Sequence, residues 1–161
     1  MAKSLESDFY LRLKFYSENL FFLLASYFCS PFLYSLVAIN NDRNKHKKDK
    51  LKILVIQIAK IGDMVCTTPV FREIKKHLPN CELTALIISK TRGIISGNPY
   101  IDKIMILDHS RYQGILGKIR LARDLAKDGY DWSVSCNTTL INNMVPFWSL
   151  IPERVSFTSE H

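Results

Sequence analysis

Three residues that could do chemistry stand together in the stretch LVIQIAKIGDMVCTTPV, namely Lys60, Gly62 and Asp63. A carboxylate can accept a proton from a hydroxyl group, a lysine can bind an anion, and a glycine lets the backbone turn sharply. They lie between an apolar run, 51–58, and a helical pattern, 64–78. In open α/β sheets this kind of connection lines the ligand site, but Asp is also a favoured helix cap. The residues alone leave both interpretations of Asp63 open.

Polar residues also follow the other predicted strands. Lys90 and Arg92 come directly after the apolar run 82–89. Asn137 comes directly after the run 131–136. The carboxyl ends of parallel strands lie at one edge of a sheet, so we expect these side chains to be close to the first loop. We predict that Lys90 and Arg92 contact an anionic group there.

The common nucleotide-binding loops and metal sites are not indicated. The loop AKIGD has neither the G-x-G-x-x-G pattern of dinucleotide-binding folds nor the G-x-x-x-x-G-K-[ST] pattern of nucleoside triphosphatases. The four cysteines are scattered, and no histidine stands near them at the spacing of a zinc site. We therefore expect no metal site, no cofactor, and free thiols that fill the core.

The chain from residue 51 onwards alternates between apolar runs and helical patterns. The predicted strands are 51–58, 82–89, 103–108, 131–136 and 154–157, and the predicted helices are 64–78, 112–128 and 138–150. Alternating strands and helices form parallel sheets with right-handed crossovers. We predict an α/β fold, a Rossmann-like parallel sheet with helices on both faces, over residues 51–161.

The first 40 residues are apolar and amphipathic. From Leu20 to Ile39 there is no charged residue, but the run contains serines and Pro31. We interpret residues 1–40 as a helical segment that associates with a membrane, either across it or on its surface. The alternative is a helical hairpin that packs on the domain and bends at Pro31.

Residues 41–50 form a basic, solvated linker between this segment and the domain. Six of the 22 Lys and Arg residues lie within residues 42–52. Because such residues stay on the cytoplasmic side and attract anionic lipids, we expect residues 1–52 to bind the cytoplasmic membrane surface. The rest of the chain is nearly balanced in charge, so no nucleic-acid partner is predicted.

Three motifs occur in a fixed order along the domain. The first is Gly62-Asp63 followed by Thr67-Thr68-Pro69, the second is GNPYIDKIMILD at 97–108, and the third is YDWSVSCNTT followed by PERVSF. Together they resemble glycosyltransferase family 9, which includes the bacterial lipopolysaccharide heptosyltransferases. The similarity runs from about residue 51 to residue 157.

The resemblance implies the N-terminal, acceptor-binding domain of a two-domain (GT-B) glycosyltransferase. Such an enzyme transfers a sugar from a nucleotide-sugar donor to a lipid-linked saccharide, with inversion and without a metal, at the cytoplasmic face of the bacterial inner membrane. Asp63 matches the general base of the family. The residues then expected to bind the acceptor are Lys60, Gly62, Thr67, Lys90, Arg92 and Asn137.

The sequence also departs from the family pattern. Ser135-Cys136-Asn137 stands where the family has Asp-Leu-Gln, so Asn137 offers an amide but a carboxylate is lost. The donor domain has no counterpart in these residues, and two domains need roughly 300 residues, so we expect a truncated chain. The alternative function is a non-catalytic, membrane-anchored binding module or one half of a split enzyme.

Overall fold

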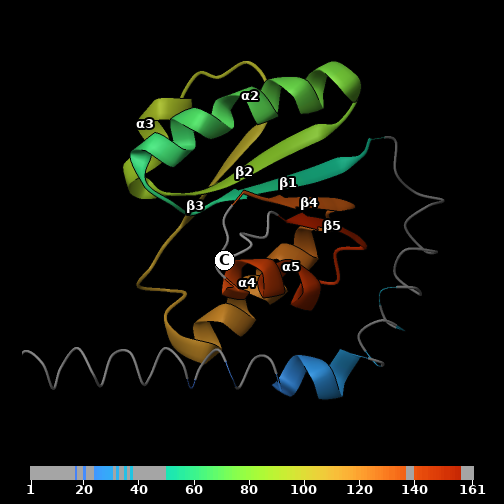
Figure 1. Ribbon diagram of the computed structural model, residues 1–161. Coiled ribbons are helices and arrows are strands. Elements are labelled where there is room, and N and C mark those ends of the chain that lie inside the picture. Colours follow the sequence, from blue (N-terminus) through green and yellow to red (C-terminus); the bar gives the residue numbers. More distant parts are fainter. Residues whose placement is uncertain are drawn as a thin grey trace, which may run out of the picture.

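The computed structural model describes residues 50–136 and 140–156 and, nearer the N-terminus, residues 17, 20, 24–30, 32, 35 and 37. Five parallel strands form one sheet in the order β3-β2-β1-β4-β5 (Figure 1). The strands are β1 (Lys52–Gln57), β2 (Glu82–Ile88), β3 (Lys103–Leu107), β4 (Trp132–Ser135) and β5 (Glu153–Ser156). The predicted α/β class and the parallel sheet are confirmed.

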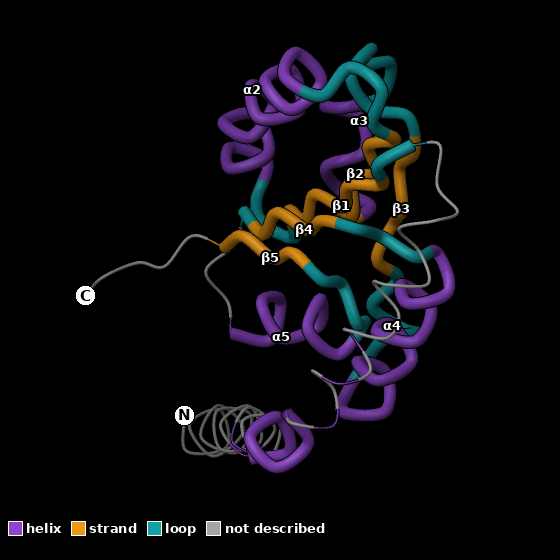
Figure 2. Tube along the Cα trace, turned by 90° about the vertical axis from the view of Figure 1, so that its right-hand side faces the viewer, coloured by secondary structure: helices purple, strands orange, loops and turns teal. Residues whose placement is uncertain are grey.

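Helices cover both faces of the sheet, as Figures 1 and 2 show from two directions. The helices α2 (Ile61–His77) and α3 (Arg92–Ile95) lie on one face, and α4 (Gly114–Asp128) and α5 (Leu140–Trp148) lie on the other. A short 3₁₀ helix, η1 (Ser89–Thr91), joins β2 to α3. The predicted two-faced arrangement is therefore confirmed.

The central strand β1 explains why two cores form. Its residues from Ile53 to Gln57 are all buried, and successive side chains of a strand point to opposite faces. Ile53 and Val55 pack in the core that contains Met64 and Phe71 of α2. Leu54 and Ile56 instead join Leu121 and Leu125 of α4 and Val145 of α5. An apolar run without alternation is what burial on both faces requires.

Two acidic residues of the motifs fix the amino ends of strands. Asp102 Oδ2 accepts hydrogen bonds from the Leu83 amide and from Lys75 Nζ, each at 2.6 Å. Asp131 Oδ2 accepts one from the Lys52 amide at 2.9 Å. Burial opposes ionisation of Asp102, but these hydrogen bonds outweigh it and lower its pKa. Both carboxylates are therefore structural, and they lie at the opposite edge of the sheet from the carboxyl ends of β1 and β2.

The helix after β1 begins earlier than predicted. The structure starts α2 at Ile61, with Lys60 as the N-cap residue, where the pattern predicted a start at residue 64. The Met64 amide donates to the Lys60 carbonyl, which closes the first turn over Ile61, Gly62 and Asp63. Gly62 is therefore a helical residue rather than a turn residue, and its φ is not among the positive values found in the described chain.

The N-terminal segment is described only in part. Residues 24–30 are helical, and the Ser26 hydroxyl accepts a hydrogen bond from the Trp148 indole of α5 at 2.9 Å. Within the residues that the structure describes, no helix has the length and hydropathy needed to cross a bilayer. Pro31 and most of the basic linker lie outside the described residues, so the predicted division at residues 40 and 50 stays a prediction.

Candidate functional site

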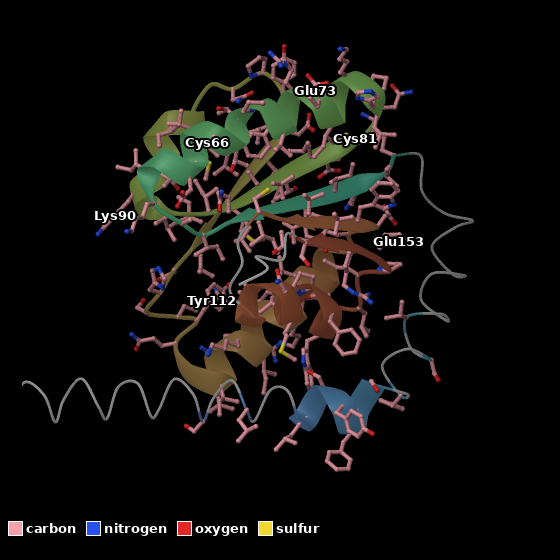
Figure 3. The ribbon with its side chains drawn as sticks, in the orientation of Figure 1. Cys66, Glu73, Cys81, Lys90, Tyr112 and Glu153 are labelled. Atoms are coloured by element: carbon pink, nitrogen blue, oxygen red, sulfur yellow. The ribbon has the colours of Figure 1, made fainter. Side chains whose placement is uncertain are left out.

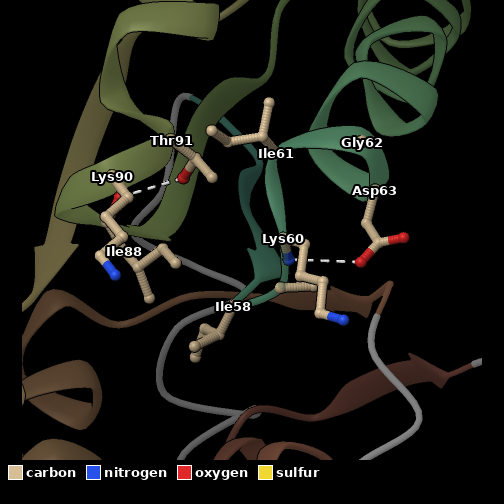
Figure 4. A pocket seen from close by; sticks show the side chains of 9 residues that line it. Ile58, Lys60, Ile61, Gly62, Asp63, Ile88, Lys90 and Thr91 are labelled. Atoms are coloured by element: carbon tan, nitrogen blue, oxygen red, sulfur yellow. Dashed lines mark hydrogen bonds between the residues drawn. The ribbon is translucent and has the colours of Figure 1, made fainter.

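A pocket of about 720 Å³ opens at the carboxyl ends of β1 and β2. It is lined by the β1–α2 connection, 58–63, and by Ile88, Lys90 and Thr91 (Figure 4). The two walls meet because β1 and β2 pair in parallel, with Gln57 opposite Ile87 in the register. This edge of the sheet is where doubly wound α/β folds bind ligands.

Asp63 stands at the rim of this pocket, in the first turn of α2. Its Oδ2 accepts a hydrogen bond from the Lys60 amide at 3.2 Å. Figure 4 shows its other carboxylate oxygen directed away from that amide, and the residue is exposed. The positive end of the helix dipole favours the negative charge here. Asp63 is therefore not the N-cap residue itself, but it bonds the amide of the N-cap residue Lys60. It also presents an oxygen to solvent, so a structural role and an exposed carboxylate are compatible.

Lys60 and Lys90 bring positive charge to opposite walls of the pocket. Both are exposed, and Figure 4 shows their side chains on either side of Ile58. Figure 3 shows Lys90 at the same end of the sheet as Cys66, with Cys81 toward the other end. Two exposed cations around one hollow are suited to an anionic ligand.

Gly62 leaves room beside Asp63. A Cβ atom built on Gly62 meets no atom within 4 Å, so the position opens to the pocket. The value of glycine here is the space that it leaves, and the sharp turn that the sequence suggested is not needed.

The remaining predicted site residues are placed differently. Thr67 is 5% exposed, and its hydroxyl faces the interior, so the predicted contact with substrate has no support in its position. Arg92 is exposed at the start of α3 and is not among the described residues that line the pocket. Asn137 lies outside the described residues, and its role stays a prediction.

A second hollow of about 580 Å³ adjoins the first along Ile88 and Lys90. It extends to the end of β3 at Asp108 and His109. Hydrogen bonds from the Ser110 side chain and amide lower the pKa of Asp108, because they favour its charged form. The residues after the third strand therefore lie at the same edge, as the parallel topology requires.

The structure also gives the positions of the cysteines and of the residue types that could bind a metal. Cys81 is buried and Cys136 is half-buried, but Cys29 and Cys66 are exposed, so the expectation of four core thiols was wrong for two of them. Burial raises the pKa of the Cys136 thiol to about 11. Within the described ranges, no group of three His, Cys, Asp or Glu side chains could hold a metal ion.

Sequence reasoning missed Gln57. This residue ends β1 and is 2% exposed, and its Nε2 donates to the Asp63 carbonyl at 3.2 Å and to Thr67 Oγ1 at 2.6 Å. The available signal was a single amide side chain inside the apolar run ILVIQI. A buried polar side chain in such a run needs a partner, and its partners lie at the site.

The fold has solved relatives among glycosyltransferases. The domain resembles the glycosyl transferase family 9 structure from Veillonella parvula, with a TM-score of 0.61 and 24% identity over 68% of this chain and 33% of that one. It also resembles the E. coli ADP-heptose LPS heptosyltransferase II, with a TM-score of 0.57 and 21% identity over 66% of this chain and 30% of that one. At these identities the likeness concerns the fold alone.

Sequence comparison also finds glycosyltransferases. The chain is 30% identical to a putative glycosyltransferase of Haemophilus influenzae over 105 residues, 65% of this chain and 30% of that protein. It is 25% identical to the lipooligosaccharide heptosyltransferase 2 of that organism (68% and 32% covered) and 26% identical to the lipopolysaccharide heptosyltransferase 2 of Salmonella typhimurium (68% and 32%). No protein-family model matches the chain. The resemblance to heptosyltransferases is confirmed, and the chain spans about a third of the length of these relatives.

Proposed function

We propose that this chain forms the acceptor-binding domain of a glycosyltransferase that acts in lipopolysaccharide biosynthesis. The reaction is transfer of a sugar, a heptose by resemblance, from a nucleotide-sugar to a lipid-linked saccharide. The observation that carries the proposal is the pocket at the ends of β1 and β2, with the Asp63 carboxylate at its rim. The similarity to proteins named heptosyltransferases supports the same reaction.

The chemistry assigned to Asp63 is general-base catalysis. An acceptor hydroxyl attacks the anomeric carbon of the donor sugar, its proton moves to the Asp63 carboxylate, and the bond to the nucleotide diphosphate breaks. Attack opposite to the leaving group inverts the anomeric centre, and no metal is assigned to the step. The exposed oxygen of Asp63 is free to take the proton while Oδ2 stays on the Lys60 amide.

Lys60 and Lys90 are assigned to the acceptor. Their ammonium groups flank the pocket and are suited to phosphate or carboxylate substituents of a saccharide. The nucleotide-sugar donor is assigned to a second domain that faces this pocket, as in two-domain glycosyltransferases. No bound cofactor is proposed.

The site of action that we propose is the cytoplasmic face of the bacterial inner membrane. In the helical stretch 24–30, Tyr27 and Phe28 are each 77% exposed, and Leu24 is 52% exposed. Apolar and aromatic side chains on one helix, followed in sequence by a basic run, suit an interface between water and anionic lipid. Such a location places the pocket near lipid-linked saccharides, and no nucleic-acid partner is proposed.

Acceptor binding by the isolated chain tests the proposal. A deacylated inner-core oligosaccharide of lipopolysaccharide, titrated into the protein, is expected to shift the amide resonances of residues 58–63 and 88–91. Lys90→Ala is expected to weaken this binding, and Lys76→Ala, a matched exposed lysine in the last turn of α2, is not. Equal effects of the two variants, or shifts confined to other regions, would remove the pocket from the proposed function.

A further inference from the structure

We propose that Gln57 and Thr67 are positioning residues that hold the main chain of Asp63 and so set the place of its carboxylate. This inference rests on the proposed function of Asp63 and deepens it. Three hydrogen bonds join the three residues. Gln57 Nε2 donates to the Asp63 carbonyl at 3.2 Å and to Thr67 Oγ1 at 2.6 Å, and Thr67 Oγ1 donates to the Asp63 carbonyl at 2.7 Å.

The network links a rigid element to the first turn of the helix. Gln57 belongs to β1, the central strand, and points to the face that α2 covers, because it follows Ile53 and Val55 at alternate positions. Thr67 lies one helical turn after Asp63 and is buried against the strand. The Asp63 carbonyl is therefore held by two side chains that cannot move far.

The carboxylate of Asp63 is fixed from the other side. Its Oδ2 accepts a hydrogen bond from the Lys60 amide at 3.2 Å. The side chain of Asp63 is thus held by the loop, and its main chain is held by Gln57 of the strand. Both constraints are needed to aim an exposed carboxylate, which otherwise samples several rotamers. Proton transfer in a transition state depends on such placement.

That residue 57 is a glutamine, and not an apolar residue, favours a role in positioning Asp63 over a role in core packing alone. Gln57 Oε1 is buried and has no hydrogen-bond partner among the described residues. A buried polar atom without a partner destabilises a fold, and an apolar side chain of similar size avoids that cost. An amide at this position therefore weakens the core locally while it fixes Asp63, which is the pattern expected of a residue kept for the site.

Hydrogen exchange of the Lys60 amide tests the inference on the chain as it exists. Gln57→Met and Thr67→Val keep the volume and remove the hydrogen bonds, and Thr67→Ser keeps the hydroxyl. We expect the first two variants to speed exchange of the Lys60 amide by about tenfold, a change of about 1.4 kcal/mol in protection. Thr67→Ser is expected to keep the original rate.

The Ser110 amide is the matched control, because it also donates to a carboxylate in an exposed loop, Asp108 Oδ1 at 2.9 Å. Its exchange is expected to stay unchanged in all three variants. Faster exchange at both amides would show general destabilisation and overturn the positioning role, and so would an unchanged Lys60 amide.

Sugar transfer separates this inference from the proposed function. In an assay that supplies the donor-binding domain, Gln57→Met and Thr67→Val are expected to lower kcat about tenfold and to leave the acceptor KM unchanged, with Thr67→Ser restoring the rate. An increase in KM alone would overturn positioning. If Asp63→Asn itself keeps full transfer, the proposed function of Asp63 fails, while the exchange result still decides whether Gln57 and Thr67 hold it.

Discussion

Replacement of Gly62 by alanine is expected to stabilise the protein and at the same time weaken acceptor binding. Gly62 is the second residue of α2, its φ is outside the positive range, and an added Cβ meets no atom within 4 Å. Alanine restricts the unfolded chain and favours the helix, which contributes about 0.5–1 kcal/mol. For a domain of this size that gain raises Tm by roughly 2–8 °C.

The same methyl group is expected to weaken binding of the acceptor. Gly62 lines the pocket beside Asp63, so the added Cβ takes space that the acceptor uses in the proposed complex. Loss of about 1 kcal/mol of binding free energy corresponds to about a fivefold increase in Kd. Stability and affinity are therefore expected to change in opposite directions.

Gly97→Ala is the matched control for this variant. Its Cβ also meets no atom within 4 Å, but its φ is +83°, where an L-residue costs about 1–2 kcal/mol. We expect a lower Tm and an unchanged acceptor Kd. Thermal unfolding and calorimetric titration with the oligosaccharide measure both quantities. A lower Tm for Gly62→Ala would refute the backbone argument, and an unchanged Kd would refute the placement of Gly62 at the acceptor.

Three further predictions concern charge and thiols. The pKa of Asp102 is lower in the folded state, so its charge stabilises the fold fully above the unfolded pKa of about 3.9, and this stabilisation is lost as the pH falls through the folded pKa. Asp102→Asn should therefore make stability depend less steeply on pH below about pH 4, measured as acid unfolding by circular dichroism. An unchanged acid transition would contradict this role. Lys90→Ala should raise the acceptor Kd about tenfold at low salt and less at high salt, with Lys76→Ala unchanged, and a salt-independent effect would argue against charge. Cys66, which is exposed, should react with a thiol reagent at pH 8 much faster than Cys136, whose pKa is about 11, and equal rates in mass spectrometry would contradict the described burial.

The strands could be predicted because their residues are buried on both faces. Runs such as 51–58 and 82–89 consist mostly of apolar and β-branched residues, and the order of strands and helices leaves few topologies. The place of Lys60 and Asp63 at the sheet edge followed from the same argument. The roles of Asp102 and Asp131 at the amino ends of β2 and β1 could not be predicted in this way. Each carboxylate accepts a hydrogen bond from the amide of a strand that is distant in sequence.

Details of the site depended on contacts that no local pattern encodes. The start of α2 was predicted three residues late, because the first turn is closed by hydrogen bonds of Lys60, and a glycine beside an aspartate resembles a loop. Thr67 lies in the motif that resembles glycosyltransferase family 9, and for that reason it was expected to bind the acceptor. Its burial and its bond to the Asp63 carbonyl are visible only once β1 lies against the helix.

The central claim is that Asp63 accepts the proton of the acceptor hydroxyl, and one kinetic comparison tests it most directly. Sugar transfer from a nucleotide-sugar to a lipid-linked saccharide is measured for the original protein and for Asp63→Asn, in membranes that also supply the donor-binding domain. The account predicts a fall in kcat of about 10²–10⁴-fold, with acceptor binding to the isolated chain retained. Transfer by Asp63→Asn at the original rate would contradict it.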